Sequence, residues 1–227
     1  MDIKKLEEKI GIEFENEKIV KNAFVHRSYL NEHPEFEMGS NERLEYLGDA
    51  VLELATSEKL YHKYPQKPEG DLTNLRAALV CTSSLATESL KLELGNYLFL
   101  SRGEEDSGGK EREYILANTF EALLGAIYLD KDYETCQRFL ENSLFYKIET
   151  IVENGTYKDS KSTLQELAQE EKGITPTYKV IEDWGPDHAK NFRMGVFLTD
   201  RKIGEGTGQS KQEGEQNAAQ NALEAWV

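Results

Sequence analysis

Three carboxylates lie within eight residues of an otherwise apolar, helix-forming segment, residues 41–52. On a helix, Glu45 and Asp49 are four residues apart and share one face, and Glu42 lies one turn earlier on the same side. Their Leu and Val neighbours are typical core residues, which places the carboxylates at the edge of a core. Carboxylates in that position favour a bound cation, and hard oxygen ligands favour magnesium or manganese. The alternative is a solvated acidic helix face, but the flanking apolar pattern favours the metal site.

A second acidic cluster lies about seventy residues further along, in residues 115–130. A helix of mostly Ile, Leu, Ala, Phe and Tyr is buried on most of its surface. Asn118 and Glu121 are three residues apart in this segment and must share a face. A Glu in such a helix is rarely buried unless it is paired or bound to a metal. Two helices that present oxygen ligands could enclose a divalent ion, which suits phosphate-ester hydrolysis.

These two segments carry a resemblance to a known family. Residues 41–52 resemble the signature of the ribonuclease III family, and residues 115–130 resemble its second catalytic helix. The resemblance extends over essentially the whole chain and includes a C-terminal double-stranded RNA-binding domain. It implies a homodimeric endonuclease that cuts both strands of duplex RNA with Mg²⁺, for which Mn²⁺ could substitute, and without a nucleotide cofactor. It also implies products with 5′-phosphates and short 3′ overhangs, and substrates among ribosomal and messenger RNA precursors.

The resemblance also implies roles for individual residues. Metal ligands would be Glu45, Asp49 and Glu121, with Asn118 in a fourth ligand position. Two further acidic positions of the family are matched by Glu42 and by Glu69, which lies in the segment Lys-Pro-Glu-Gly. The expected catalytic residues are therefore Glu42, Asp49, Glu69 and Glu121.

Asn118 departs from the family pattern, which usually has Asp at this position. Its amide oxygen can coordinate a hard cation, but it carries no charge and cannot accept a proton, so divalent-ion binding should weaken. Three interpretations stay open: a natural variant that remains active, a naturally weakened enzyme, or an introduced change. Two functional classes follow, an active nuclease or a silent double-stranded RNA-binding scaffold. The intact acidic residues favour the nuclease.

Composition describes a globular protein of one or two domains. Of its 227 residues, 38% are hydrophobic and 30% are charged. The chain lacks an apolar run long enough to cross a membrane and an N-terminal signal sequence, so we expect a cytoplasmic protein without a membrane partner. The two cysteines, Cys81 and Cys136, are far apart and are expected to be reduced core thiols.

The net charge of −15 argues against a nucleic-acid partner. Residues 158–227 hold 9 Lys and Arg against 12 Asp and Glu, so they carry −3 and the rest of the chain carries −12. Local placement can override net charge, because duplex RNA is recognised through a few phosphate and 2′-hydroxyl contacts. We therefore expect RNA binding that is weaker and more salt-sensitive than in a basic relative.

The periodicity predicts a mostly α-helical protein with an all-helical endonuclease domain in residues 1–154. Helices are expected over residues 3–10, 18–30, 41–64, 69–94, 115–130 and 132–153, with Asn41 as an N-cap and a charged, mobile loop over residues 102–112. A lone His at position 26 on the second helix favours a structural role. Tyr46 and its apolar neighbours are the expected dimer interface.

From residue 161 the pattern changes to the α-β-β-β-α order of the double-stranded RNA-binding fold, residues 161–227. Helices are expected over residues 162–171 and 210–226, with Ala218 and Ala219 packed on the sheet, and strands over residues 177–182, 191–198 and 201–206. The expected RNA-binding residues are Ser162, Gln165 and Gln169 on one helix face, Pro186 and His188 in a loop, and Lys211 at a helix N-terminus. Gln212 and Gly214 replace a second Lys and an Ala usual in relatives; the Gly should lower helix stability by roughly 1 kcal/mol.

Overall fold

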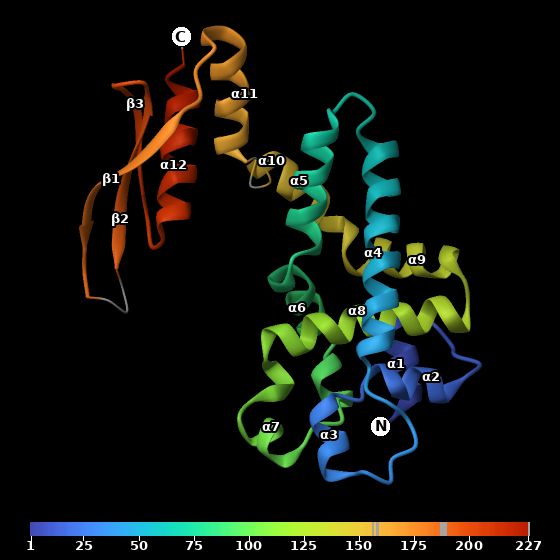
Figure 1. Ribbon diagram of the computed structural model, residues 1–227. Helices are drawn as coiled ribbons and strands as arrows, with labels where there is room; N and C mark the ends of the chain where they lie inside the picture. Colours follow the sequence, from blue (N-terminus) through green and yellow to red (C-terminus); the bar gives the residue numbers. More distant parts are fainter. Residues whose placement is uncertain (156, 158, 187–189, 227) are drawn as a thin grey trace. The chain divides into compact units, whose positions relative to one another are not determined.

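The computed structural model describes residues 1–155, 157, 159–186 and 190–226 of the chain. It contains two compact units, residues 1–157 and 158–227 (Figure 1). Where it is described, the first unit forms helices and one isolated β-bridge, and the second combines helices with a three-stranded sheet. The mostly α-helical fold class is therefore confirmed. The domain boundaries at residues 154 and 161 stay a prediction.

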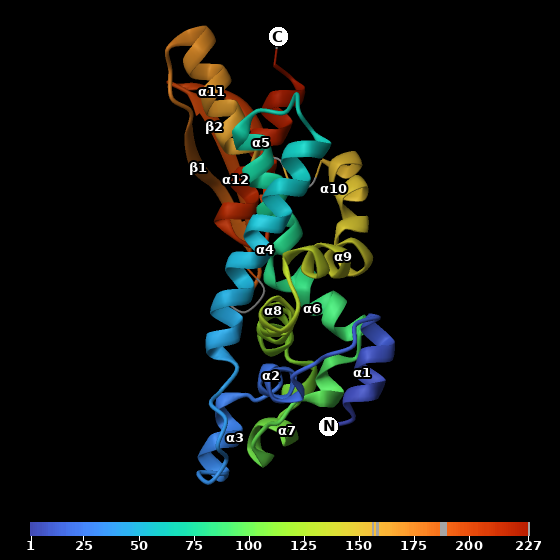
Figure 2. The same ribbon diagram turned by 90° about the vertical axis from the view of Figure 1, so that its right-hand side faces the viewer.

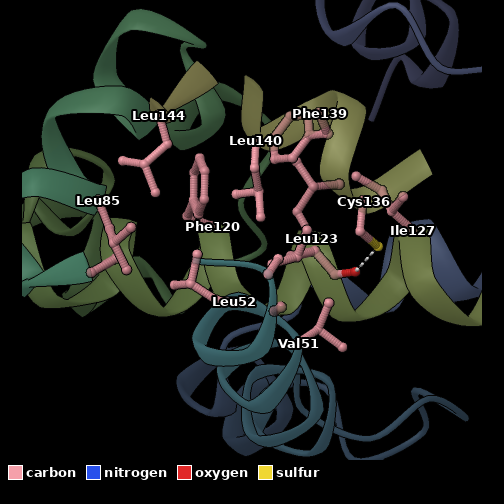
Figure 3. Close-up of a cluster of buried hydrophobic side chains, with 14 of the residues drawn as sticks. Val51, Leu52, Leu85, Phe120, Leu123, Ile127, Cys136, Phe139, Leu140 and Leu144 are labelled. Atoms are coloured by element: carbon pink, nitrogen blue, oxygen red, sulfur yellow. Dashed lines mark hydrogen bonds between the residues drawn. The ribbon is translucent and has the colours of Figure 1, made fainter. Parts of the chain in front are cut away.

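The first unit is built around helix α8 (Glu113–Asp130), which is buried along most of its length. Its principal contact is with α4 (Glu42–Lys63), and Figure 2 shows α8 end-on with α4 passing across it. Figure 3 shows Phe120, Leu123 and Ile127 of α8 among side chains of α4, α6 and α9. The remaining elements surround this pair: α1 (Ile3–Ile10), α2 (Glu17–Ala23), α3 (Arg27–Glu32), α5 (Glu69–Val80), α6 (Thr82–Lys91), η1 (Leu94–Tyr97), α7 (Arg102–Asp106), η2 (Gly109–Glu111), α9 (Tyr133–Ser143), η3 (Phe145–Lys147) and α10 (Ile148–Asn154).

The helix predicted over residues 18–30 is wrong, because two helices, α2 and α3, occupy this stretch. Between them the backbone is extended at Val25, which forms a β-bridge with Phe99. The amide of His26 donates to the Phe99 carbonyl at 3.1 Å. Asn41 does not cap α4: its own backbone is helical, and its side chain instead donates to the carbonyl of Ala23 at 3.2 Å.

Three further predictions in this unit need correction. The stretch 69–94 is divided at Cys81, whose ψ of 155° ends α5 and begins α6. The stretch 132–153 contains α9, η3 and α10, and the expected loop 102–112 contains α7 and η2. Cys136 is a core residue as predicted, whereas Cys81 is exposed at the junction between its two helices.

The second unit has the predicted α-β-β-β-α order: α11 (Ser160–Lys172), β1 (Thr177–Trp184), β2 (Asn191–Leu198), β3 (Arg201–Gly208) and α12 (Lys211–Glu224). The antiparallel strands lie in the order β1-β2-β3, and α12 packs on β3 and β2 (Figure 1). Ala218 and Ala219 are fully buried, as predicted. A Cβ on Gly206 would lie 2.2 Å from the Ala218 nitrogen, so the close helix–strand contact requires glycine there.

Gly214 belongs to the same contact. An added Cβ would lie 2.6 Å from the Cγ of Met194, which is buried. The glycine therefore makes room for a core side chain, an effect that helix propensity alone does not include. Among the described residues, no helix combines the length and apolar composition needed to cross a membrane.

Candidate functional site

Two glycines bring the acidic helices together. A Cβ on Gly48 of α4 would lie 1.8 Å from the Glu121 carbonyl oxygen, and a Cβ on Gly125 of α8 would lie 2.3 Å from the Leu44 carbonyl oxygen. Neither helix could carry any other residue at these points without moving apart. The crossing therefore places Glu45, three residues before Gly48, and Asp49, directly after it, next to the face of α8 that carries Asn118 and Glu121.

A pocket of about 800 Å³ opens beside this crossing. It is lined by five of the predicted site residues, from α4 and α8: Glu42, Glu45, Asp49, Asn118 and Glu121. The helical spacings in the sequence thus placed these side chains correctly on facing surfaces. Glu42 and Asp49 are exposed, whereas Glu45, Asn118 and Glu121 are partly buried.

The electrostatics of the pocket disfavour negative charge. Burial raises the pKa of Glu121 to about 7, and the carboxylates of Asp49 and Glu45 add to this shift. Burial likewise raises the pKa of Glu45, with further contributions from Glu42 and Asp49, while a hydrogen bond from Asn118 acts in the opposite direction. A cation bound among these groups would relieve both effects.

The donor set fits a hard divalent ion in its chemistry. Three carboxylates and the amide oxygen of Asn118 are all oxygen ligands, the kind that Mg²⁺ and Mn²⁺ prefer. In the part of the chain that the structure describes, no three His, Cys, Asp or Glu side chains are grouped so as to hold a metal ion. Ion binding would therefore have to draw the repelling carboxylates together, or use Asn118 as a ligand.

Glu69 does not join this pocket. It begins α5 and lines a different hollow of about 640 Å³, beside Leu54 and Tyr61 of α4. Its Oε1 accepts a hydrogen bond from the Thr73 hydroxyl at 2.9 Å. Within one chain, therefore, the structure separates Glu69 from the other predicted catalytic residues.

Sequence reasoning missed several pocket residues, among them His26, Ser28 and Glu104. His26 does have the structural role that was predicted, because its Nδ1 caps α3 by accepting from the Ser28 amide at 3.3 Å. Glu104 reaches the pocket from α7, in the stretch that was expected to be a loop, and is ion-paired with Arg112 at 2.5 Å. The β-bridge between Val25 and Phe99 helps to bring these segments together, and neither residue signals it in the sequence.

The predicted RNA-binding residues of the second unit are exposed where they are described. Ser162 and Gln165 of α11 line a shallow hollow of about 280 Å³ together with Gln212 of α12. Gln169 lies one turn further along α11 on the same face. Of the others, Lys211 begins α12 with its Nζ 5.8 Å from the Phe192 ring centroid, Pro186 is exposed after β1, and His188 lies outside the described residues.

A helical unit with facing carboxylates, followed by an α-β-β-β-α unit, indicates a protein of the metal-dependent nuclease class with an RNA-binding domain. A family model described as ribonuclease-III-like matches residues 16–148, and one for the double-stranded RNA binding motif matches residues 160–225. The chain belongs to the ribonuclease III family.

Curated relatives match nearly the full chain. It is 46% identical over 228 residues to Ribonuclease 3 of Oceanobacillus iheyensis, covering 99% of this chain and 98% of that protein. It is 47% identical over 222 residues to Ribonuclease 3 of Geobacillus kaustophilus, covering 96% of this chain and 89% of that protein. Double-stranded RNA endoribonuclease is therefore the function of this chain, and the relatives give no support to a silent scaffold.

Solved structures agree for the first unit. The nuclease domain of ribonuclease III from Campylobacter jejuni aligns with a TM-score of 0.58 at 39% identity, over 66% of this chain and 95% of that one. A second structure of that domain, described for flexibility in a region involved in dimer formation, aligns with a TM-score of 0.57 at 40% identity, over 63% and 98%. Enzymes of this family generally depend on a divalent metal.

Proposed function

We propose that this endoribonuclease uses Mg²⁺, with Mn²⁺ able to substitute, bound by Glu45, Asp49, Asn118 and Glu121. The observation that carries the proposal is that these four oxygen-bearing side chains from α4 and α8 line one pocket, where burial and two neighbouring carboxylates raise the pKa of Glu121 to about 7. Such a site has more acidic than basic groups and gains stability from a cation. When bound, the ion would polarise a phosphoryl oxygen and lower the pKa of a coordinated water.

The residues of the chain itself orient this site. Asn118 acts to lower the pKa of the Glu45 carboxyl, which favours the ionised form that would bind the metal. Glu42 stands exposed at the pocket rim, where the Ser40 hydroxyl donates to its Oε2 at 2.7 Å and Arg27 lies 3.9 Å away. We assign Glu42, Asp49 and Glu121 to the cleavage chemistry on this placement.

A homodimer follows from the exposed surface of α4. Tyr46, Leu54 and Tyr61 are 81%, 58% and 68% exposed and recur at helical spacing, so they form an apolar stripe on one face. Paired through this stripe, two copies would match the two-fold pseudo-symmetry of a duplex, with one site for each strand. Glu69 adjoins the stripe, so a catalytic role for Glu69 requires the second copy.

The second unit would hold the duplex through neutral contacts. Ser162, Gln165 and Gln169 offer donors and acceptors suited to 2′-hydroxyls in a minor groove, and the segment containing Pro186 and His188 would reach a neighbouring groove. Lys211 would contact phosphate at the N-terminus of α12. By family membership we expect 5′-phosphate products with short 3′ overhangs, precursors of ribosomal and messenger RNA as substrates, and a cytoplasmic location.

The test is cleavage of an end-labelled perfect duplex RNA over Mg²⁺ and Mn²⁺ series, with the unchanged chain, Asn118→Asp and Glu121→Ala. We expect cleavage by the unchanged chain, none by Glu121→Ala, and a lower metal requirement for Asn118→Asp because a fourth carboxylate strengthens ion binding. Binding without cleavage at every metal concentration, with activity restored in Asn118→Asp, would instead make this chain a silenced form.

A further inference from the structure

His26 occupies a backbone position that is fixed from two sides. Its amide donates to the Phe99 carbonyl at 3.1 Å, and the carbonyl of its neighbour Val25 accepts from the Asn41 amide at 2.8 Å. The imidazole therefore projects from a rigid corner between the start of α3 and the start of α4. From there it lines the pocket that contains Glu45 and Glu121.

The hydrogen bonds of the ring define its tautomer. The Ser28 backbone amide, which can only donate, points to Nδ1 at 3.3 Å, and the Ser28 hydroxyl lies 2.8 Å from the same nitrogen. Nδ1 must therefore be an acceptor, and the ring proton resides on Nε2. Burial lowers the pKa of His26, although the nearby Glu104 acts in the opposite direction. The ring is thus neutral, with an N–H on the nitrogen that the α3 cap does not use.

Some other donors of the described pocket lining already have partners. Asn41 donates its side-chain NH₂ to the Ala23 carbonyl at 3.2 Å. Arg27 lies within 3.9 Å of Glu42, and the Ser28 hydroxyl is shared between His26 and the Ser101 amide. Nε2 of His26 has no hydrogen-bond partner among the described residues.

We propose that the Nε2–H of His26 donates a hydrogen bond to an oxygen of the RNA backbone in the pocket and so positions the strand to be cut. The inference rests on the proposed nuclease function and adds a substrate-contacting residue to it. A neutral, rigidly held donor suits a pocket rich in carboxylates, because it binds an anionic strand without forming an ion pair with those carboxylates.

The test separates the two nitrogens of the ring. Asn is among the best N-cap residues, so His26→Asn keeps an acceptor for the Ser28 amide but lacks a donor at the Nε2 position. We expect His26→Asn to melt like the unchanged chain and still to bind duplex RNA. Its kcat for duplex cleavage should fall by about 10- to 100-fold, as for loss of a hydrogen bond to a charged group. His62→Asn makes the same exchange at an exposed α4 position outside the pocket, and its kcat should stay unchanged.

Cleavage by His26→Asn at the unchanged rate would overturn the proposal and leave His26 as a helix cap. A second measurement does not depend on how the variant folds. In ¹⁵N NMR of the unchanged chain, the His26 ring should show protonated Nε2, and this signal should shift when duplex RNA is added in metal-free buffer. An unshifted signal with bound RNA would also overturn it. Because this readout needs no cleavage, it separates failure of this inference from failure of the proposed nuclease.

Discussion

The carboxyl group of Glu121 lies in an environment that disfavours its negative charge. Burial comes first among the causes, and Asp49 and Glu45 add to it, so the pKa rises from 4.5 to about 7. The folded state then binds the proton more tightly than the unfolded state. The contribution of Glu121 to stability without metal is therefore most favourable below pH 4.5, falls as the pH rises toward 7, and levels off above it.

We predict that Glu121→Gln raises the free energy of unfolding in EDTA by roughly 2–3 kcal/mol at pH 8. The neutral amide removes the buried charge, so the two proteins should be equally stable near pH 4. Urea denaturation between pH 4 and 8.5 measures this difference. Added Mg²⁺ should stabilise the unchanged chain more than the variant, and parallel stability curves across the pH range would contradict the argument.

The sequence predicted the residues of the site better than their surroundings. The spacings of Glu45 with Asp49 and of Asn118 with Glu121 fix a helix face each, so their convergence needed only that the two helices pack together. Glu69 and His26 differ from these, because their places depend on contacts made elsewhere in the chain. Glu69 lies beside Leu54 and Tyr61, further along α4 than the acidic pocket, and His26 is placed by the β-bridge of its neighbour Val25.

At the level of elements, the close crossing of α4 and α8 depends on two glycines, Gly48 and Gly125, which have no Cβ atom. We predict that Gly48→Ala lowers the free energy of unfolding by about 2–4 kcal/mol, since its Cβ would lie 1.8 Å from a backbone oxygen. The same displacement should separate Glu45 from Glu121 and abolish cleavage. Chemical denaturation and duplex cleavage measure the two effects.

Gly70→Ala is the matched control for this prediction. Gly70 is also helical, in α5, but an added Cβ there meets no atom within 4 Å. The substitution should stabilise the protein by about 0.5–1 kcal/mol through helix propensity alone. If both alanines had similar effects, the close crossing would not be what makes Gly48 necessary.

A buried carboxylate, that of Glu88, links helix α6 to η3. Glu88 is 3% exposed and accepts from Lys147 at 2.6 Å and from the Tyr146 hydroxyl at 2.7 Å. Burial alone would raise the pKa of Glu88, but these hydrogen bonds and one from Lys91 outweigh it and hold the pKa below 4.5. The ionised group therefore stabilises the fold above pH 4.5, and that contribution is lost as the pH falls through the lowered pKa.

We predict that Glu88→Gln lowers the free energy of unfolding at pH 7 by about 2–4 kcal/mol, because it leaves the partly buried Lys147 without its counter-charge. The difference should shrink below pH 4, which thermal melts at several pH values would detect. Glu134→Gln removes the exposed ion pair with Arg138 and should change stability by less than about 1 kcal/mol. Equal losses in the two variants would refute the role of burial.

Helix positions were predicted well, and helix ends were not. The apolar periodicity of residues 18–30 continues through Val25, but the extended backbone there pairs with Phe99, 74 residues away. Similarly, nothing in the local pattern around Cys81 signals the turn from α5 to α6. Local preferences act over one or two turns, whereas these breaks are set by tertiary contacts.

At the level of the whole molecule, the net charge of −15 opposes RNA binding, so each basic side chain that contacts a phosphate matters for affinity. Gln212 is exposed and shares its hollow with Ser162 and Gln165, two of the proposed RNA contacts. We predict that Gln212→Lys tightens binding to duplex RNA and steepens the dependence of log K on log salt by about one unit, as for one added phosphate contact. Filter binding over a KCl series measures both quantities.

The control for this variant is Gln220→Lys, which adds the same charge at an exposed position further along α12. If placement matters more than net charge, this variant should leave the salt slope unchanged. Identical slopes for the two variants would indicate that the total charge, and not the hollow on α11 and α12, controls affinity.

The two cysteines also make the chain simple to follow by fluorescence. Cys81 is exposed at the α5–α6 junction, while burial raises the pKa of Cys136 to about 12 and leaves it almost no reactive thiolate at neutral pH. A maleimide dye should therefore mark each chain once, without engineering. Photobleaching steps would then count the subunits that assemble on a single RNA duplex.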